Sequence, residues 1–224
     1  MMRAFVVSAV VSAALLAGCG YGPNMGVGRD QVVGSGARKS ERRDVAEFNR
    51  LVVEGAYRVE VTCGGRSRSL EIEADDNLLP LISTDVEGGR LRIHSGRGMT
   101  TETMPHIRID VPDLVEVSIP GASDFRVDSL NNDAFKLNVE GASKFRAAGE
   151  TGRLDITLGG AGLVDTRELR ARSVNVVNDG AGLVSVHATD ALDATVNGVG
   201  TVDYYGDPKT VNPKVNGFGK ITRK

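Results

Sequence analysis

The sequence predicts an all-β protein, a right-handed parallel β-helix (β-solenoid) with rungs of about 18–20 residues. Three observations indicate this fold class. Glycine accounts for 28 of 224 residues and aromatic residues for only 4%, a composition that favours short strands separated by turns. Glycine-centred tripeptides recur at a nearly constant spacing. Apolar residues alternate with polar ones on both sides of these tripeptides, as in strands with one buried face.

The first 18 residues have the composition of a bacterial lipoprotein signal peptide. Residues 1–3 form a short basic start, and the run over 4–16 is apolar apart from two serines. This run is shorter than the roughly 20 residues that a membrane-spanning helix needs. It ends in Leu-Ala-Gly-Cys at 16–19, which resembles a lipobox, so we expect Cys19 to be acylated. The alternative is a chance cysteine at an ordinary secretory cleavage site.

A flexible tether is predicted over residues 19–43, which are rich in glycine and charge and show no sustained periodicity. Gly20 after the cysteine, in place of aspartate, resembles the pattern that directs Gram-negative lipoproteins to the outer membrane. The expected location is therefore the cell envelope, on either side of the outer membrane. Cys63 is the second of two cysteines. With Cys19 committed to lipid, we expect no disulfide and a half-buried Cys63 on a strand.

Six glycine tripeptides, at spacings of 18 to 20 residues, define an internal repeat. They are Gly121-Ala122-Ser123, Gly141-Ala142-Ser143, Gly160-Ala161-Gly162, Gly180-Ala181-Gly182, Gly198-Val199-Gly200 and Gly217-Phe218-Gly219. Positions six, four and two before the first glycine and four after it are apolar, except at Asn178 and Pro213. Recurrence of one residue type at one offset predicts parallel strands stacked in register, joined by right-handed connections. An antiparallel sandwich is the alternative, but it leaves that recurrence unexplained.

The corner glycines are expected to supply a positive φ or room for the next rung to approach closely. Pro213 falls in the last rung, which predicts an outer strand, because a strand with a free edge loses least from a missing N–H.

The same alignment, run backwards, places an earlier rung at Gly55, so the domain is predicted over 44–224. Three more strands are expected before Gly121. They cover 68–74, 90–94 and 106–111. A short helical turn over 76–82 is expected to cap the N-terminal end of the coil.

The order of several short motifs resembles a bacterial family, the autotransporter adhesin head GIN domains. The shared motifs are Phe48-x-x-Leu51-x-Val53-x-Gly55, Asp76-Asn77-Leu78-Leu79 with Glu87-Gly88-Gly89-Arg90-Leu91, Pro112-Asp113-Leu114, and the Gly-Ala-Ser and Gly-Ala-Gly turns. The likeness covers about residues 44 to 222. It implies a right-handed parallel β-helix on secreted or lipid-anchored envelope proteins. It supplies no catalytic residues.

Residues that could take part in catalysis or metal binding are scattered along the sequence. The spacing of His94, His106 and His187 is not that of a metal site, and the sequence contains no catalytic motif. We therefore expect the protein to bind no metal or cofactor and to have no enzymatic activity. The candidate binding face is a polar ladder on the outer side of the strands. Its members are Ser118, Asn138, Thr157, Asn175 and Thr195. Outward charges alternate in sign between rungs, as in Arg146 and Asp165, which predicts stabilising cross-strand neighbours.

The function predicted is a lipid-anchored, non-enzymatic interaction domain of the cell envelope, adhesin-like and either surface-exposed or periplasmic. Its expected partners are the membrane, through the lipid, and a glycan or envelope protein. A net charge of −2 gives no attraction to nucleic acid. The alternative is an envelope glycan-binding or carbohydrate-active β-helix that uses outward acidic columns, in which Asp155 and Asp193 lie two rungs apart. A purely structural lipoprotein is a third possibility.

Overall fold

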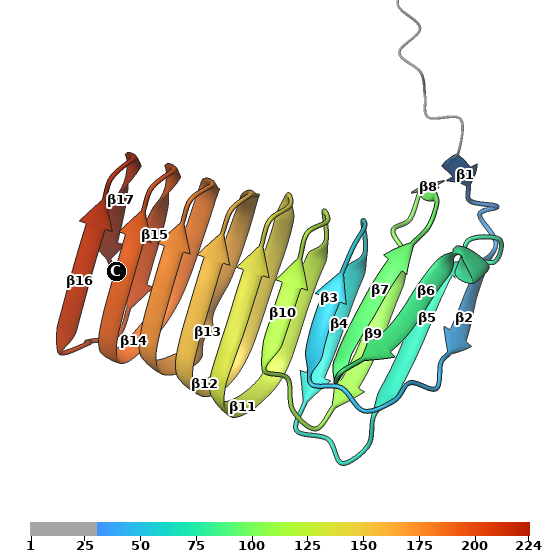
Figure 1. Ribbon diagram of the computed structural model, residues 1–224, viewed down its shortest axis with the longest axis horizontal. Helices are drawn as coiled ribbons and strands as arrows, with labels where there is room; N and C mark the ends of the chain where they lie inside the picture. The colour runs from blue at the N-terminus through green and yellow to red at the C-terminus, as the bar shows by residue number, and fades with distance from the viewer. Residues whose placement is uncertain (1–30) are drawn as a thin grey trace, which may run out of the picture.

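The computed structural model describes residues 31–224, which form a β-solenoid of stacked coils (Figure 1). Fifteen strands belong to one hydrogen-bonded sheet that closes around an apolar core, and β1 and β8 form a separate two-stranded sheet. The predicted signal peptide, Cys19 and the tether up to residue 30 lie outside the described residues. Within the described part, no helix has the length and apolar character needed to cross a membrane.

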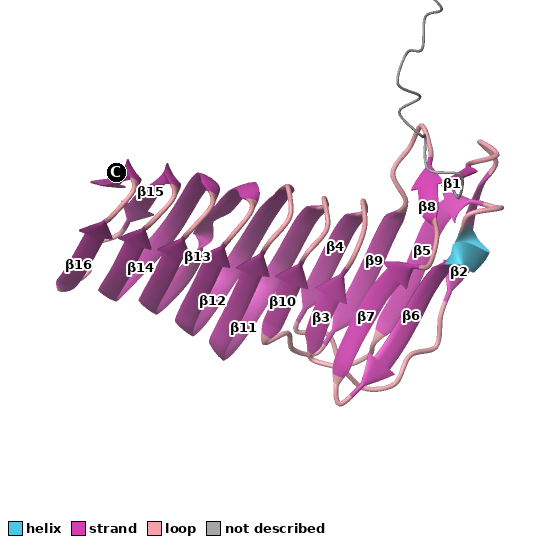
Figure 2. Ribbon diagram, turned by 45° about the horizontal axis from the view of Figure 1, so that its top comes forward, coloured by secondary structure: helices cyan, strands magenta, loops and turns pink. Residues whose placement is uncertain are grey.

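The repeat region is built from four long strands and several short ones. They are β10 (Glu116–Ile119), β11 (Asp124–Val139), β12 (Ser143–Leu158), β13 (Ala161–Asn178), β14 (Ala181–Val196), β15 (Val199–Tyr205), β16 (Thr210–Val215) and β17 (Phe218–Arg223). Each long strand starts after one glycine corner, bends, and ends before the next. Its first half belongs to what we call the post-glycine face and its second half to the pre-glycine face, so the two faces enclose the core between them (Figure 2).

Successive coils pair in parallel, in the register that the repeat predicts. On the post-glycine face Phe125 pairs with Phe145, and Phe145 pairs with Val164. On the pre-glycine face Val117 pairs with Leu137, and the ladder continues to Pro213 in β16, which is the outer strand there. These pairs confirm the β-solenoid and exclude the antiparallel sandwich.

The N-terminal end departs from the parallel pattern. Its elements are β3 (Arg50–Val53), β4 (Arg58–Cys63), β5 (Ser69–Asp75), the 3₁₀ turn η1 (Leu79–Leu81), β6 (Ile82–Glu87), β7 (Arg90–Ser95) and β9 (His106–Val111), with β1 (Gln31–Val33) and β8 (Gly98–Thr100) beside them. Strands β3, β4, β7 and β9 stack in parallel as a rung around Gly55 should, whereas β5 and β6 pair antiparallel with β9 and β7. The predicted strands and cap are confirmed, but the end of the coil is closed by antiparallel strands.

The prediction of a flexible tether reaching residue 43 is wrong for its C-terminal part. Strand β2 (Arg38–Arg42) pairs antiparallel with β5, and the Arg38 guanidinium lies 3.5 Å from Glu73 and 3.6 Å from Asp75. This strand is polar because only one side of it covers the domain. It therefore lacks the alternating apolar pattern by which a strand is recognised from sequence.

The core is a narrow stack of aligned side chains. The inward columns of β11 to β14 are fully or almost fully buried. Phe145 stacks on Phe125 and Phe135, with ring centroids 5.6 and 6.3 Å apart. Asn178 is buried in a column that is otherwise apolar, and its Nδ2 donates to the Gly182 carbonyl at 3.4 Å. Val115 was expected inward but is only half-buried, since Leu114 occupies the core where β10 enters.

The corner glycines lie directly on one another. A Cβ on Gly160 would overlap the carbonyl oxygen of Gly141, and a Cβ on Gly180 would overlap that of Gly160. The same holds along the column from Gly121 to Gly217, whereas only Gly55 among the corner glycines has a positive φ, of 135°. Close approach of successive coils, rather than left-handed backbone, is the reason for glycine at these corners.

We expect Gly160→Ala to lower the free energy of unfolding by about 1–3 kcal/mol, as overpacking does at other rigid sites. The added methyl group meets backbone atoms, which cannot rotate away. Chemical denaturation followed by circular dichroism measures the change. Gly96→Ala is the control, because a Cβ there meets no atom within 4 Å. Equal stability of the two variants would contradict the close-contact explanation.

We expect Val176→Asp to abolish folding or to cost more than about 4 kcal/mol, because it buries an unpaired charge. Val176 is 0% exposed and points into the core, whereas the adjacent Val177 is half-buried on the outer side. Val177→Asp should therefore cost about 1 kcal/mol, the range of strand propensity. Soluble yield and thermal unfolding distinguish the two, and a near-neutral Val176→Asp would invalidate the assignment of inward positions.

We expect the Cys63 thiol to be unreactive in the folded protein. Cys63 is 5% exposed, and burial, with Asp113 and Asp128 nearby, raises its pKa to about 12. The thiolate that attacks a disulfide reagent is therefore almost absent at pH 8. In the Cys19→Ala background, where Cys63 is the sole cysteine, a colorimetric thiol assay should show labelling only after denaturation. Rapid stoichiometric labelling of the native protein would be the contrary result.

Candidate functional site

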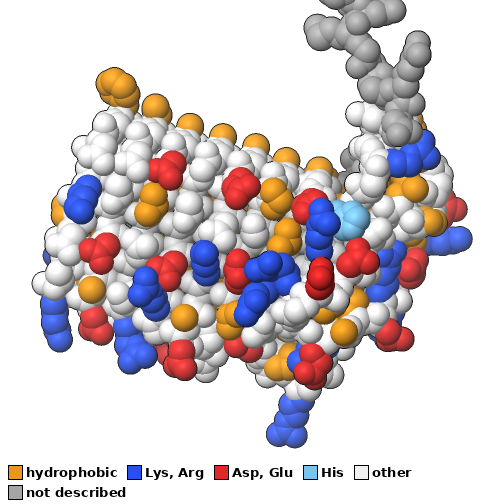
Figure 3. Space-filling view, in the orientation of Figure 1, with side chains coloured by type: hydrophobic (Ala, Val, Ile, Leu, Met, Phe, Trp, Pro, Cys, Tyr) orange, Lys and Arg blue, Asp and Glu red, His pale blue; other side chains and the backbone are white. Residues whose placement is uncertain are grey.

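The predicted polar ladder exists on the pre-glycine face. Ser118 pairs with Asn138, Asn138 with Thr157, Thr157 with Val177, and Val177 with Thr195. Figure 3 shows that Lys, Arg, Asp and Glu side chains are scattered over this broad face, while apolar side chains line its upper edge. Four of the five predicted residues therefore share a row on a wide surface.

Asn175 does not belong to that row. It lies in the neighbouring column, between Asp155 and Asp193, and its Nδ2 donates to Asp155 Oδ1 at 3.4 Å. Arg153 donates to the same Asp155 carboxylate at 2.8 and 2.9 Å. The two aspartates are thus separated by one coil and each has its own partners, with Asn212 donating to Asp193 at 2.8 Å. This column offers no close carboxylate pair for acid–base chemistry.

The outward charges do not pair in the way that the sequence predicts. Arg146 and Asp165 are register neighbours, as expected. Asp165 nevertheless forms its ion pair with Arg167, two residues along the same strand, at 2.6 Å. Arg126 and Asp128 make an equivalent pair at 2.6 Å. Because residues i and i+2 share one face of a strand, Arg126 and Arg167 both find a carboxylate without crossing to the next coil.

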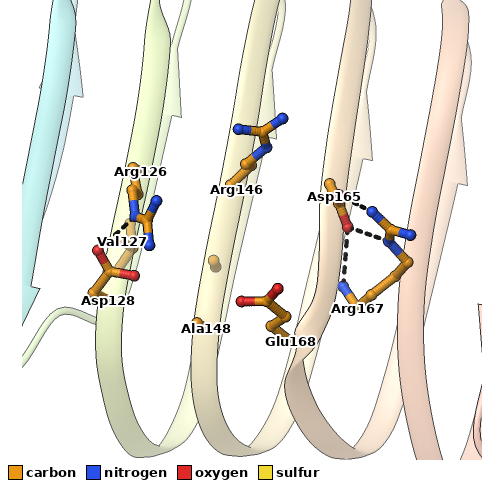
Figure 4. A pocket seen from close by; sticks show the side chains of 9 residues that line it. Arg126, Val127, Asp128, Arg146, Ala148, Asp165, Arg167 and Glu168 are labelled. Carbon is orange, nitrogen blue, oxygen red and sulfur yellow. Dashed lines mark hydrogen bonds and ion pairs between the residues drawn. The ribbon is translucent and has the colours of Figure 1, made fainter.

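These charges surround a hollow on the post-glycine face, with a cavity volume of about 280 Å³ (Figure 4). It is lined by Arg126, Val127, Asp128, Arg146, Ala147, Ala148, Asp165, Arg167 and Glu168. We call it the arginine hollow. Its floor is low at β12, because Ala148 has only a methyl group where β13 places Glu168 beside it. Longer side chains on β11 and β13 form its walls.

A β-bulge in β13 shapes one wall. The register shifts between Arg146 and Ala148 of β12, opposite a longer stretch of β13 that runs from Asp165 to Glu168. Thr166 is buried and donates to the Ser185 carbonyl at 3.0 Å. The consecutive residues Arg167 and Glu168 are both exposed. Bulges commonly redirect side chains near functional sites in this way. Two adjacent outward residues depart from the strict alternation that the repeat predicts.

Hydrogen bonding fixes the charge states in this wall. Arg167 donates to Asp165 through Nε at 2.8 Å and through Nη2 at 2.6 Å. These bonds lower the pKa of Asp165 and raise the pKa of Arg167. The Arg167 guanidinium also lies over the Tyr205 ring, 5.8 Å from its centroid. Asp165 is therefore an ionised positioning group, since a proton donor near neutral pH needs a raised pKa.

Arg146 differs from the other two arginines of the hollow. Arg126 hydrogen-bonds to Asp128, and Arg167 to Asp165, whereas no described carboxylate lies within ion-pair distance of Arg146. Figure 4 shows its guanidinium standing between those two pairs. The sequence predicts that Arg146 lies in an outward charged column and pairs with Asp165. Arg146 has no ion-pair partner in the described part of the chain because its register neighbour Asp165 pairs with Arg167, which lies at the bulge.

The possible metal ligands of residues 31–224 are dispersed over the domain. No group of three or more His, Cys, Asp or Glu residues there could hold a metal ion. The histidines lie apart: His94 faces Asp85 at 3.0 Å, His106 faces Glu60 at 3.1 Å, and His187 lies near the Arg167 carbonyl. Each has its own local partner.

Comparison with solved structures finds the same fold in bacterial proteins. A "putative adhesin" from Bacteroides fragilis is 23% identical and has a TM-score of 0.65, over 86% of this chain and 100% of that one. A "putative adhesin" from Parabacteroides merdae is 21% identical with a TM-score of 0.53, over 87% and 99%. A "putative lipid binding protein" from Parabacteroides distasonis is 18% identical with a TM-score of 0.50, over 87% and 100%. At these identities the likeness shows the fold alone. No curated protein matches the chain.

A family model shows the ancestry more directly. The model described as "Putative auto-transporter adhesin, head GIN domain" matches residues 47–208. That range runs from just before β3 to just before β16, so it contains most of the stacked coils and the whole arginine hollow. The match agrees with the resemblance seen in the short motifs. The chain therefore belongs to the auto-transporter adhesin head GIN domain family.

Proposed function

We propose that this protein is a lipid-anchored, non-enzymatic interaction domain of the bacterial cell envelope, with an adhesin-like role. The observation that carries the proposal is membership of an adhesin head family on a rigid solenoid with two broad, solvent-exposed faces. Stacked repeats characteristically present extended surfaces of this kind to their partners. The hydrogen-bonded coils hold the outward side chains in fixed rows, so little ordering entropy is lost on binding.

The arrangement of carboxylates supports a binding role over a catalytic one. Glycoside hydrolysis uses two carboxyl groups, one of them with a raised pKa. Asp155 and Asp193 are separated by Asn175, and Asp165 is held ionised by Arg167. A glycan-binding function is the second candidate, and the arginine hollow favours it, because arginines and carboxylates together can contact the acidic and hydroxyl groups of a sugar.

The N-terminal sequence supports attachment through a lipid. The basic start, the apolar run and Leu-Ala-Gly-Cys at 16–19 occur in the order that lipoprotein processing requires. Gly20 favours the outer membrane as the destination. In this proposal Cys19 carries the acyl chains and the segment up to β1 connects the anchor to the solenoid.

We expect Cys19→Ala to move the full-length protein from the membrane fraction to the soluble fraction of its host. The cysteine sulfur is the acceptor of the lipid, and a single unlipidated segment of 13 mainly apolar residues is too short to span the bilayer. Fractionation by ultracentrifugation followed by immunoblotting provides the measurement.

The matched control is Cys63→Ser, which changes the other cysteine and leaves the lipobox intact. It should remain in the membrane fraction and incorporate radiolabelled palmitate like the wild type. Membrane association of Cys19→Ala at the wild-type level would contradict lipid anchoring, whatever the solenoid binds.

A further inference from the structure

We propose that the arginine hollow binds an acidic saccharide, with Arg146 contacting the carboxylate of the sugar and Glu168 accepting hydrogen bonds from its hydroxyl groups. The inference rests on the proposed interaction role and names the class of ligand. It concerns a site on the post-glycine face, whereas the sequence pointed to a polar ladder on the opposite face.

The first step is the availability of Arg146. It is exposed in the middle of the hollow, and its register neighbour Asp165 is already engaged by Arg167. A guanidinium offers a planar fork of donors that fits both oxygens of a carboxylate. Figure 4 shows the Arg146 side chain between the two arginine–aspartate pairs, with its guanidinium directed away from Ala148 and Glu168. Asp165 attracts Arg146 electrostatically but forms its hydrogen bonds with Arg167, so a ligand carboxylate would meet guanidinium donors that no described carboxylate uses.

The second step is the availability of Glu168. It is exposed, and within residues 31–224 its carboxylate has neither a hydrogen bond nor an ion pair, although Arg126 attracts it at longer range. The bulge turns it outward beside Ala148, and Figure 4 shows its carboxylate directed toward β12. A carboxylate accepts hydrogen bonds from hydroxyl groups through both oxygens. One ligand that presents an anion to Arg146 and hydroxyls to Glu168 is an acidic sugar.

The third step is the rigidity of the walls. Arg126 is held by Asp128, and Arg167 by Asp165 and by contact with the Tyr205 ring. These side chains are therefore positioned before a ligand arrives, which reduces the entropy lost on binding. The volume of about 280 Å³ is slightly below the range of typical ligand pockets, about 300–1,000 Å³. It suits one sugar unit of a longer chain that runs across the coils.

The balance of charge separates this site from a general polyanion surface. Its three arginines are matched by three carboxylates, those of Asp128, Asp165 and Glu168, so the hollow has no net charge. Attraction of a polymer by charge alone is therefore weak here. Recognition must come from the positions of individual groups, and removing an acidic group should weaken binding rather than strengthen it.

The experiment uses the full-length Cys19→Ala protein, with circular dichroism to verify folding of each variant. Surface plasmon resonance measures its binding to immobilised polygalacturonate, alginate and a sialylated glycan. Methyl-esterified polygalacturonate is the matched ligand control, since it keeps the sugar chain and removes the carboxylate charge. We expect binding to at least one acidic glycan and at least a tenfold loss on its neutral counterpart.

Three variants test the assigned roles. Arg146→Gln should weaken binding at least tenfold, and Glu168→Gln at least threefold. Arg172→Gln is the control, because it removes one exposed arginine that does not line the hollow. It should bind like the parent protein. Dextran sulfate should bind no more tightly than the carboxylated glycan.

The inference is overturned if no acidic glycan binds, if Arg146→Gln behaves like Arg172→Gln, or if Glu168→Gln strengthens binding, which would indicate attraction by charge alone. Binding of purified protein does not require the lipid, so these results are independent of the Cys19 fractionation. A protein that adheres to cells equally well with and without Arg146 would retain its adhesin role and refute the saccharide site.

Discussion

The close contact between stacked corner glycines is the constraint on which the rest of this structure depends. Each corner places one glycine against the carbonyl of the glycine below, from Gly121 to Gly217, where a side chain would overlap backbone. Coils that approach so closely can pair all along their strands, and they must do so in register. Register in turn aligns apolar residues into continuous buried columns, such as the one that contains Phe125 and Phe145. A narrow core of this kind needs stacked aliphatic and phenyl side chains, which accounts for the scarcity of larger aromatic residues.

In-register parallel stacking also determines how the surface can carry charge. Residues at the same offset become neighbours about 4.8 Å apart, so a row of like charges would repel itself. Sign does not alternate strictly, because Arg126 and Arg146 are register neighbours. The like charges are instead balanced by pairing Arg126 with Asp128, and Arg167 with Asp165, along a single strand. Regular stacking alone yields flat faces. The hollow arises where regularity is broken twice, by the small Ala148 and by the bulge that turns both Arg167 and Glu168 outward.

The features that repeat at a fixed spacing could be predicted from the sequence, and the features that interrupt the repeat could not. The corner glycines and the inward apolar residues recur at fixed spacings, so aligning the repeats identifies them. The same alignment places Pro213 in the last rung. Strand β2 is held in place by pairing with β5. Its polar sequence has no alternating pattern, so it was predicted to be part of the flexible tether. The arginine hollow could not be predicted, because aligning the repeats at fixed spacings does not reveal an extra residue within one strand. Asn175 was assigned to the polar ladder although its offset differs from that of Thr157 by two residues.

The two ends of the solenoid are protected in different ways against pairing with other strands. The broad faces remain as the surfaces suited to ligands. At the N-terminal end, β2, β6 and η1 close the coil with antiparallel strands and a turn. At the other end, β16 and β17 are edge strands, and Val215 and Phe218 are 45% and 87% exposed. Such edges tend to pair with other strands. Pro213 removes a backbone donor from β16, and Lys214 and Lys220 give both edge strands positive charge. Two copies meeting at these edges would bring like charges together, which disfavours end-to-end pairing.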